Sequence, residues 1–186
     1  MSDDVFRVAF VCTGNRFRSP LAAALLSRAA DGVPIEISSA GTLELRGAKA
    51  LPEAQEAAVR FGVDLTEHRS RSVTEAPLHD ADLVIGFERM HVATAVVDGG
   101  ARRDRTFTLP ELVDLLAGIE SSSSSTPVAR ARDTVRRAAA ARPQDDPRLL
   151  SIAELADPLG RSDDEQREIA ERLRELTLQV HRSLFA

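Results

Sequence analysis

The sequence has a single cysteine, Cys12, and neither tryptophan nor tyrosine. One cysteine excludes an internal disulfide framework and any metal site built from several thiolates. No apolar run approaches the ~20 residues that span a bilayer. The start, MSDDVFRVAF, also lacks the basic region that opens a signal peptide. We therefore expect a cytoplasmic protein that does not insert into membranes.

Lysine is nearly absent as well, since Lys49 is the only one among 24 lysines and arginines. The 29 acidic residues leave a formal net charge of −5. This charge argues against general nucleic-acid binding, because a surface that follows a phosphate backbone normally has a basic excess. With 186 residues, 43% of them hydrophobic, the chain is long enough for one domain with a sizeable core.

Four short apolar runs predict buried strands, because they are rich in β-branched and aromatic residues. In chain order they are 5–11, 34–42, 81–88 and 105–109. Helical patterns separate them, and strands that alternate with helices favour a parallel sheet covered on both faces. The predicted fold is therefore α/β, a three-layer sandwich with a small, mostly parallel four-stranded sheet flanked by helices.

Helix signals follow the first strand and close the chain. Ser19 is a candidate N-cap, with Pro20 in the first helical turn. The segment 51–62 predicts a second helix. Ser162 and Glu165 have the spacing of a capping box, and the apolar residues that follow repeat at helical spacing, at Ile169, Leu173, Leu176 and Val180. We expect a terminal amphipathic helix packed on the sheet.

The segment at about 119–147 differs from the rest of the chain. It opens with the serine run 121–125, which is typical of a flexible linker. An Arg- and Ala-rich piece follows, which can form a basic helix whose alanine face would anchor it poorly. We expect a solvated insertion in a single domain spanning 1–186, and a docking element for an acidic partner is the alternative.

The loop VCTGNRFRSP, residues 11–20, holds the only thiol. A loop that leaves a parallel strand and enters a helix gathers backbone N–H groups around one point, where the helix dipole favours negative charge. Gly14 lets the backbone approach a ligand, and Asn15 tolerates a left-handed conformation. Arg18 offers a two-pronged donor for phosphate oxygens. With Cys12 at its floor and Ser19 beside it, the loop predicts an oxyanion cradle that contains a nucleophile.

This loop resembles the active-site loop of the low-molecular-weight protein tyrosine phosphatases, including their bacterial members. The similarity continues through four further stretches and covers nearly all of the chain except the insertion: SSAGT at 38–42, GVDLTEHRSR at 62–71, ADLVIGFERMH at 81–91 and ADPLG at 156–160. The resemblance implies a phosphatase domain that hydrolyses phosphotyrosine in proteins. It implies neither cofactor nor metal, and a phosphorylated protein as partner, of which a bacterial tyrosine kinase is one candidate.

The resemblance also assigns residues to roles. Cys12 would attack phosphorus and form a phosphocysteine, Arg18 would hold the transferring group, and Asp157 would act as general acid and then as general base. The phosphate-binding positions are Thr13, Gly14, Asn15, Arg16, Phe17, Arg18 and Ser19. The loop-supporting positions are Asn15, Ser19, Ser39 and His68. Asp146, followed by Pro147, is a competing Asp-Pro pair further from the terminal helix.

The sequence departs from the family pattern at the pocket. Phe17 stands where many members carry a second cysteine, so arsenate reduction through an internal disulfide shuttle is excluded. Arg16 stands where tyrosine-directed members usually have an aliphatic residue and arginine-phosphate phosphatases a threonine. We expect its guanidinium to attract acidic groups and to repel a positively charged substrate. Leu45 and Leu159 complete the expected wall, where aromatic residues are common.

Two other functions remain open. The same cradle could reduce arsenate with an external small thiol, or could recognise a phosphorylated partner with little turnover. Retention of both Cys12 and Asp157 argues against a pure binder, which needs neither nucleophile nor acid. The remaining histidines have no ligand-like grouping, and no role is assigned to His79, His91 or His181.

Overall fold

One four-stranded sheet forms the centre of the molecule. The structure is a computed structural model that describes residues 4–120, 124–142 and 154–185. All strand pairs are parallel, in the order β2-β1-β3-β4. The strands are β1 Phe6–Cys12, β2 Ile35–Gly41, β3 Leu83–Gly86 and β4 Thr106–Thr108. The predicted α/β sandwich is confirmed, and the sheet is wholly parallel.

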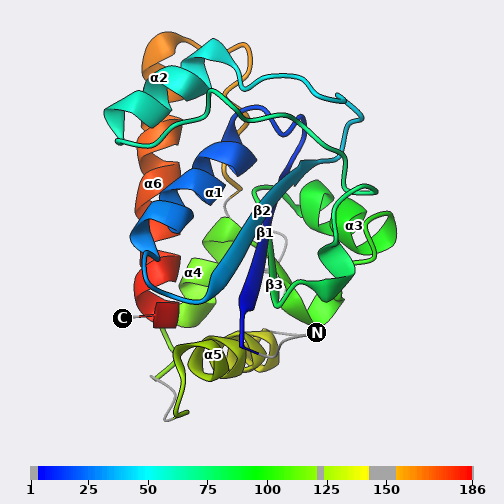
Figure 1. Cartoon of the computed structure of the whole chain (residues 1–186), viewed down its shortest axis with the longest axis vertical. Coiled ribbons are helices and arrows are strands. Elements are labelled where there is room, and N and C mark those ends of the chain that lie inside the picture. The colour runs from blue at the N-terminus through cyan, green and yellow to red at the C-terminus, as the bar shows by residue number, and fades with distance from the viewer. Residues whose placement is uncertain (1–3, 121–123, 143–153, 186) are drawn as a thin grey trace.

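Helices cover both faces of this sheet, with α1 and α6 on one side and α3 on the other (Figure 1). The helices are α1 Arg18–Ala29, α2 Pro52–Arg60, α3 Arg89–Val97, α4 Leu109–Leu116, α5 Pro127–Ala141 and α6 Asp163–Phe185, with short 3₁₀ turns η1 Leu78–Asp80 and η2 Arg103–Arg105. None of the helices in the described ranges combines the length and hydropathy that a membrane crossing requires.

Strand β1 shows why the domain has three layers. Its residues alternate between the two faces, as the strand pleat requires. Phe6, Val8 and Phe10 join the larger core cluster under α1 and α6. Ala9 and Val11 join the smaller cluster on the face of α3. Because both faces are covered, the strand reads as a continuous apolar run.

Two predicted helix features have different outcomes. The capping box before α6 is confirmed, because Ser162 N donates to Glu165 Oε2 at 3.0 Å and Glu165 N donates to Ser162 Oγ at 3.4 Å. Ser19 is not the N-cap of α1, which has Phe17 at that position and no side-chain cap. Instead, Ser19 is fully buried, and its hydroxyl faces Cys12. The Ser19 hydroxyl therefore supports the cysteine loop and does not cap the helix.

The expectation that alanine would anchor the Arg-rich helix poorly is wrong. α5 packs into the larger core cluster through four buried residues, Val128, Ala131, Val135 and Ala138. At its end, Arg142 Nε bonds Glu111 Oε1 at 2.7 Å, and its guanidinium lies 4.2 Å from the centroid of the Phe107 ring. The small side chains of α5 let it approach its neighbours closely, and the contacts of Arg142 hold its C-terminal end in place. Part of the serine run (121–123) and Asp146 lie outside the described residues.

Candidate active site

The loop that joins β1 to α1 lies at the carboxyl end of the sheet, at the upper end of the molecule in Figure 1. The strand order places β2 on one side of β1 and β3 on the other, so the chain reverses direction across the sheet beside β1. Ligands of open α/β sheets bind outside the carboxyl ends of the strands at such a point. The topology therefore places the cysteine loop at the expected position of a binding site.

Cys12 ends β1 and is 3% exposed, with Sγ 3.0 Å from Ser19 Oγ. The first turn of α1 begins six residues later at Arg18, and a helix N-terminus favours negative charge near it. Gly41 of β2 supports the loop from below. A Cβ at this position would lie 2.9 Å from the Thr13 carbonyl oxygen, so only glycine permits this close approach.

Asn15 holds the loop in shape. It is fully buried and has a φ of 51°, a left-handed conformation that asparagine tolerates. Its Nδ2 donates to Ser19 Oγ at 2.9 Å and to Ser39 Oγ at 2.8 Å. Its Oδ1 accepts from Arg71 N at 3.1 Å, and its carbonyl oxygen lies 2.6 Å from His68 Nε2. The structure thus brings together the four residues expected to support the loop.

The Asn15→Ala variant is expected to lose about 2–3 kcal/mol of unfolding free energy, because it leaves buried partners unsatisfied and keeps a positive φ. Urea denaturation measures this loss. Asn15→Gly is the matched control: it removes the same side chain but relieves the backbone, and should recover about 1 kcal/mol. Equal stability of the two variants would contradict the role of the left-handed conformation.

Arg18 is the most constrained side chain of the site. It is 1% exposed and binds two carboxylates, Glu88 through Nη1 and Asp157 through Nη2, the latter at 2.5 Å. Nη1 also donates to the Leu155 carbonyl oxygen at 2.9 Å. The guanidinium lies 5.8 Å from the centroid of the Phe87 ring. The position and orientation of the Arg18 guanidinium are therefore fixed from several sides.

Glu88 and His91, which follow β3, were not predicted as site residues. His91 is fully buried, and its Nε2 lies 3.0 Å from Thr13 Oγ1. Burial lowers its pKa to about 4, and the nearby Arg18 guanidinium acts in the same direction. The carboxyl ends of parallel strands meet at one edge, so the position of Glu88 and His91 at and just after the end of the predicted strand 81–88 was the available signal.

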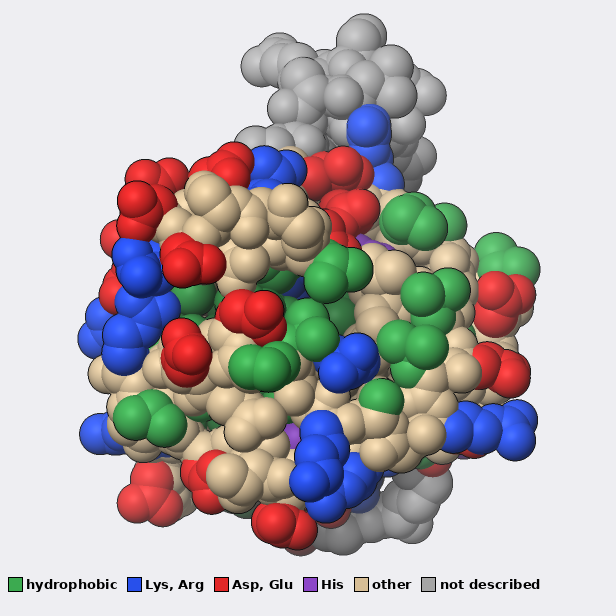
Figure 2. Space-filling view, turned by 90° about the horizontal axis from the view of Figure 1, so that it is seen from above, with side chains coloured by type: hydrophobic (Ala, Val, Ile, Leu, Met, Phe, Trp, Pro, Cys, Tyr) green, Lys and Arg blue, Asp and Glu red, His purple; other side chains and the backbone are tan. Residues whose placement is uncertain are grey.

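A pocket of about 110 Å³ lies above the loop. It is lined by Cys12, Thr13, Gly14, Arg16, Phe17, Arg18, Leu43, Leu45, Leu51, Asp157 and Leu159. The set includes the three expected wall residues and adds Leu43 and Leu51. Arg16 Nε donates to the Lys49 carbonyl oxygen at 2.8 Å. On the face seen from above, hydrophobic side chains stand in small groups among charged ones (Figure 2).

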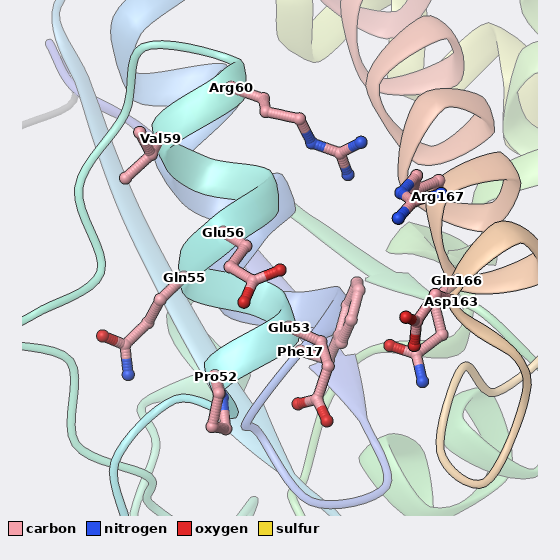
Figure 3. Close-up of a pocket in the computed structure, with 10 residues that line it drawn as sticks. All are labelled: Phe17, Pro52, Glu53, Gln55, Glu56, Val59, Arg60, Asp163, Gln166 and Arg167. Carbon is pink, nitrogen blue, oxygen red and sulfur yellow. The ribbon is translucent and has the colours of Figure 1, made fainter.

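A larger groove of about 690 Å³ lies between α2 and the start of α6 (Figure 3). Phe17 lines both this groove and the smaller pocket. The groove carries exposed carboxylates such as Glu53 and Glu56, and the guanidinium groups of Arg60 and Arg167. It contains neither the thiol nor the buried arginine. We therefore place the chemistry in the smaller pocket.

Across the described ranges, no three His, Cys, Asp or Glu side chains form a group that could hold a metal ion. The groups that the pocket does offer are those that phosphoryl transfer through a thiol requires: a nucleophile, a fixed cation and a carboxyl group. The sequence profile of the low molecular weight phosphotyrosine protein phosphatases matches residues 7–136, and the chain belongs to this family.

Relatives within the family carry different substrate names. A protein-arginine-phosphatase of Bacillus subtilis (strain 168) is 38% identical over 108 residues, 57% of this chain and 71% of the relative. The probable tyrosine phosphatase EpsP of Ralstonia solanacearum is 41% identical over 78 residues, 42% of this chain and 52% of the relative. The chain thus spans about half the length of that second relative.

Solved structures agree over nearly the whole chain. The crystal structure of a YwlE mutant from B. subtilis has a TM-score of 0.69 at 29% identity and covers 96% of this chain and 98% of its own. A low molecular weight protein tyrosine phosphatase from T. tengcongensis has a TM-score of 0.68 at 28% identity, covering 94% and 96%. A further solved structure is that of a protein named YwlE arginine phosphatase, so the structural neighbours carry the names of both substrate classes.

Proposed function

We propose that this protein hydrolyses phosphotyrosine in proteins through a phosphocysteine on Cys12. The observation that carries the proposal is the pocket of about 110 Å³ lined by Cys12, Arg18 and Asp157 together. They supply three different functional groups: a thiol, a guanidinium and a carboxyl group. A small cavity that brings these groups together suits phosphoryl transfer. Asp157 lines this pocket, and it is preferred over Asp146 because its Asp-Pro pair leads directly into the terminal helix.

In the first step, the Cys12 thiolate attacks phosphorus. The S–P bond forms while the P–O bond to the leaving group breaks, and Asp157 gives its proton to the leaving oxygen. Arg18 and the loop amides hold the charge on the equatorial phosphoryl oxygens. In the second step, water attacks phosphorus, Asp157 takes its proton, and the S–P bond breaks. Inorganic phosphate is released and the Cys12 thiolate is restored, with no metal in either step.

Phosphotyrosine is the first choice of substrate because the pocket walls are apolar. Leu43, Leu45 and Leu159 are all partly or largely exposed at the pocket, where they can pack against a phenyl ring. None of these three wall residues is aromatic, so the ~0.5–1.5 kcal/mol of a ring pair is missing at these positions. This composition favours broad aryl-phosphate specificity over tight selection of one peptide.

Phosphoarginine is the second candidate, supported by the name of the protein-arginine-phosphatase of B. subtilis. Arg16 opposes it, because a guanidinium at the pocket would repel the guanidinium of that substrate. The bond from Arg16 Nε to the Lys49 carbonyl oxygen keeps this charge at the pocket edge.

The substrate test compares a phosphotyrosine peptide with a phosphoarginine peptide of the same sequence, in the presence of a chelator. Wild-type protein should have a kcat/KM at least ~10-fold higher for phosphotyrosine, and Arg16→Thr should raise phosphoarginine turnover by about tenfold, because it removes one like-charge repulsion. Higher wild-type activity on phosphoarginine would overturn the substrate assignment and leave the cysteine chemistry intact.

The same assay separates the other functions. Arsenate turnover that requires an added small thiol, without phosphatase activity, would support a reductase. Phosphopeptide binding without hydrolysis of either peptide would support a recognition module.

A further inference from the structure

The side chain of Thr13 stands between a buried histidine and the candidate general acid. Thr13 Oγ1 lies 3.0 Å from His91 Nε2, and it donates to Asp157 Oδ2 at 3.4 Å. Arg18 Nη2 also donates to the same hydroxyl oxygen at 3.3 Å. The hydroxyl therefore joins the end of β1, the segment after β3 and the loop before α6.

The backbone fixes the tautomer of His91. Its Nδ1 lies 3.1 Å from the amide nitrogen of Glu88 and 3.4 Å from that of Phe87. Amide N–H groups only donate, so Nδ1 must be the unprotonated acceptor. The lowered pKa of His91 keeps the ring neutral near neutral pH, and a neutral ring then carries its one proton on Nε2. His91 consequently donates to Thr13.

The direction of the Thr13 proton follows. Thr13 Oγ1 accepts from His91 Nε2 and from Arg18 Nη2, and these two donors occupy its two lone pairs. The hydroxyl proton is left for its third neighbour, Oδ2 of Asp157. His91 therefore donates to Thr13, and Thr13 donates to Asp157.

We propose that Thr13, oriented by His91, is a positioning residue that holds the Asp157 carboxyl group for proton transfer to the leaving oxygen. This inference rests on the proposed phosphatase function and deepens it. Oδ1 of Asp157 accepts from Leu159 N at 3.0 Å, so each carboxyl oxygen has its own neutral donor.

The role of Thr13 becomes important when substrate binds. A bound phosphoryl group competes with Asp157 for the Nη2 donor of Arg18, because both offer oxygen acceptors. Thr13 and the Leu159 amide then remain as the donors that keep the carboxyl group in place.

The test uses Thr13→Val, which keeps the shape and removes the hydroxyl, on a series of aryl phosphates whose leaving groups differ in pKa. The value of kcat/KM reports the first step, in which the leaving oxygen is protonated. We expect a loss of about tenfold for poor leaving groups, the effect of one hydrogen bond, and under ~3-fold for the best leaving group, which needs little protonation. An equal loss across the series would show a merely structural role and overturn the inference.

Matched variants separate the partners. Thr13→Ser should restore the wild-type dependence on leaving-group pKa. His91→Asn keeps an acceptor near the Glu88 amide but lacks the donor toward Thr13, and should behave like Thr13→Val. His91→Gln, which keeps a donor near the Nε2 position, should retain more activity. In an Asp157→Ala background, Thr13→Val should add no further loss, since residues that act as one unit are not additive. Additive losses would contradict the inference.

A second measurement does not depend on activity. Nitrogen NMR of wild-type protein should show His91 as the Nε2–H tautomer, with an Nε2 proton that exchanges slowly and becomes fast-exchanging in Thr13→Val. The Nδ1–H tautomer would overturn the inference. If wild-type protein hydrolyses no aryl phosphate, or if Cys12→Ser keeps full activity, the proposed function fails, and the tautomer result still decides the hydrogen-bond arrangement.

Discussion

Replacement of Cys12 by serine is expected to reduce kcat on aryl phosphates by about 10⁴-fold or more. A serine hydroxyl keeps its proton near neutral pH and is a far weaker nucleophile than a thiolate. The substitution preserves size and retains a partner for Ser19, whose Oγ lies 3.0 Å from Cys12 Sγ. The fold should therefore remain intact.

Steady-state hydrolysis of para-nitrophenyl phosphate measures the loss, and equilibrium binding of inorganic phosphate provides the control. Cys12→Ser should still bind phosphate, because Arg18 and the loop amides are unchanged. Residual turnover within about 100-fold of wild type would show that another nucleophile performs the chemistry.

Arg18→Lys is expected to reduce kcat/KM by about 10²–10⁴-fold. Lysine keeps one positive charge beside Glu88 and Asp157 but lacks the planar set of donors that reaches two phosphoryl oxygens at once. It also cannot serve Glu88, Asp157 and the Leu155 carbonyl oxygen together, as the guanidinium does.

The matched control for charge is Arg18→Ala, which leaves the Glu88 carboxylate without its cationic partner and should lower stability as well as activity. Thermal unfolding separates the two effects. If Arg18→Lys retained activity within about threefold of wild type, charge alone would suffice and the two-pronged clamp would be contradicted.

The sequence predicts the fold well where one pattern dominates. The apolar run of β1 and the Ser162–Glu165 capping box are strong local signals, and both predict the observed elements. Helices α3 and α4 were missed because each follows its strand almost without a break. α4 begins at Leu109 directly after β4, with Thr108 as its cap.

Short sequence motifs predicted part of the candidate site. Cys12, Arg18 and Asp157 could be named because each belongs to a recognisable short motif. Glu88 and His91 lie in the stretch ADLVIGFERMH, which suggested no role for either residue, and their proximity to Arg18 and Thr13 depends on the order of strands in the sheet. Sequence patterns predict strands, but they do not specify which strand ends become neighbours.

The most direct test of the phosphocysteine mechanism is to quench the wild-type protein during turnover of a radiolabelled phosphotyrosine peptide and to map the labelled residue. The mechanism predicts label on Cys12, and none on a Cys12→Ala variant, which has no side-chain nucleophile at this position. Label on a different residue, or turnover with no covalent label at times shorter than one catalytic cycle, would contradict a phosphocysteine intermediate.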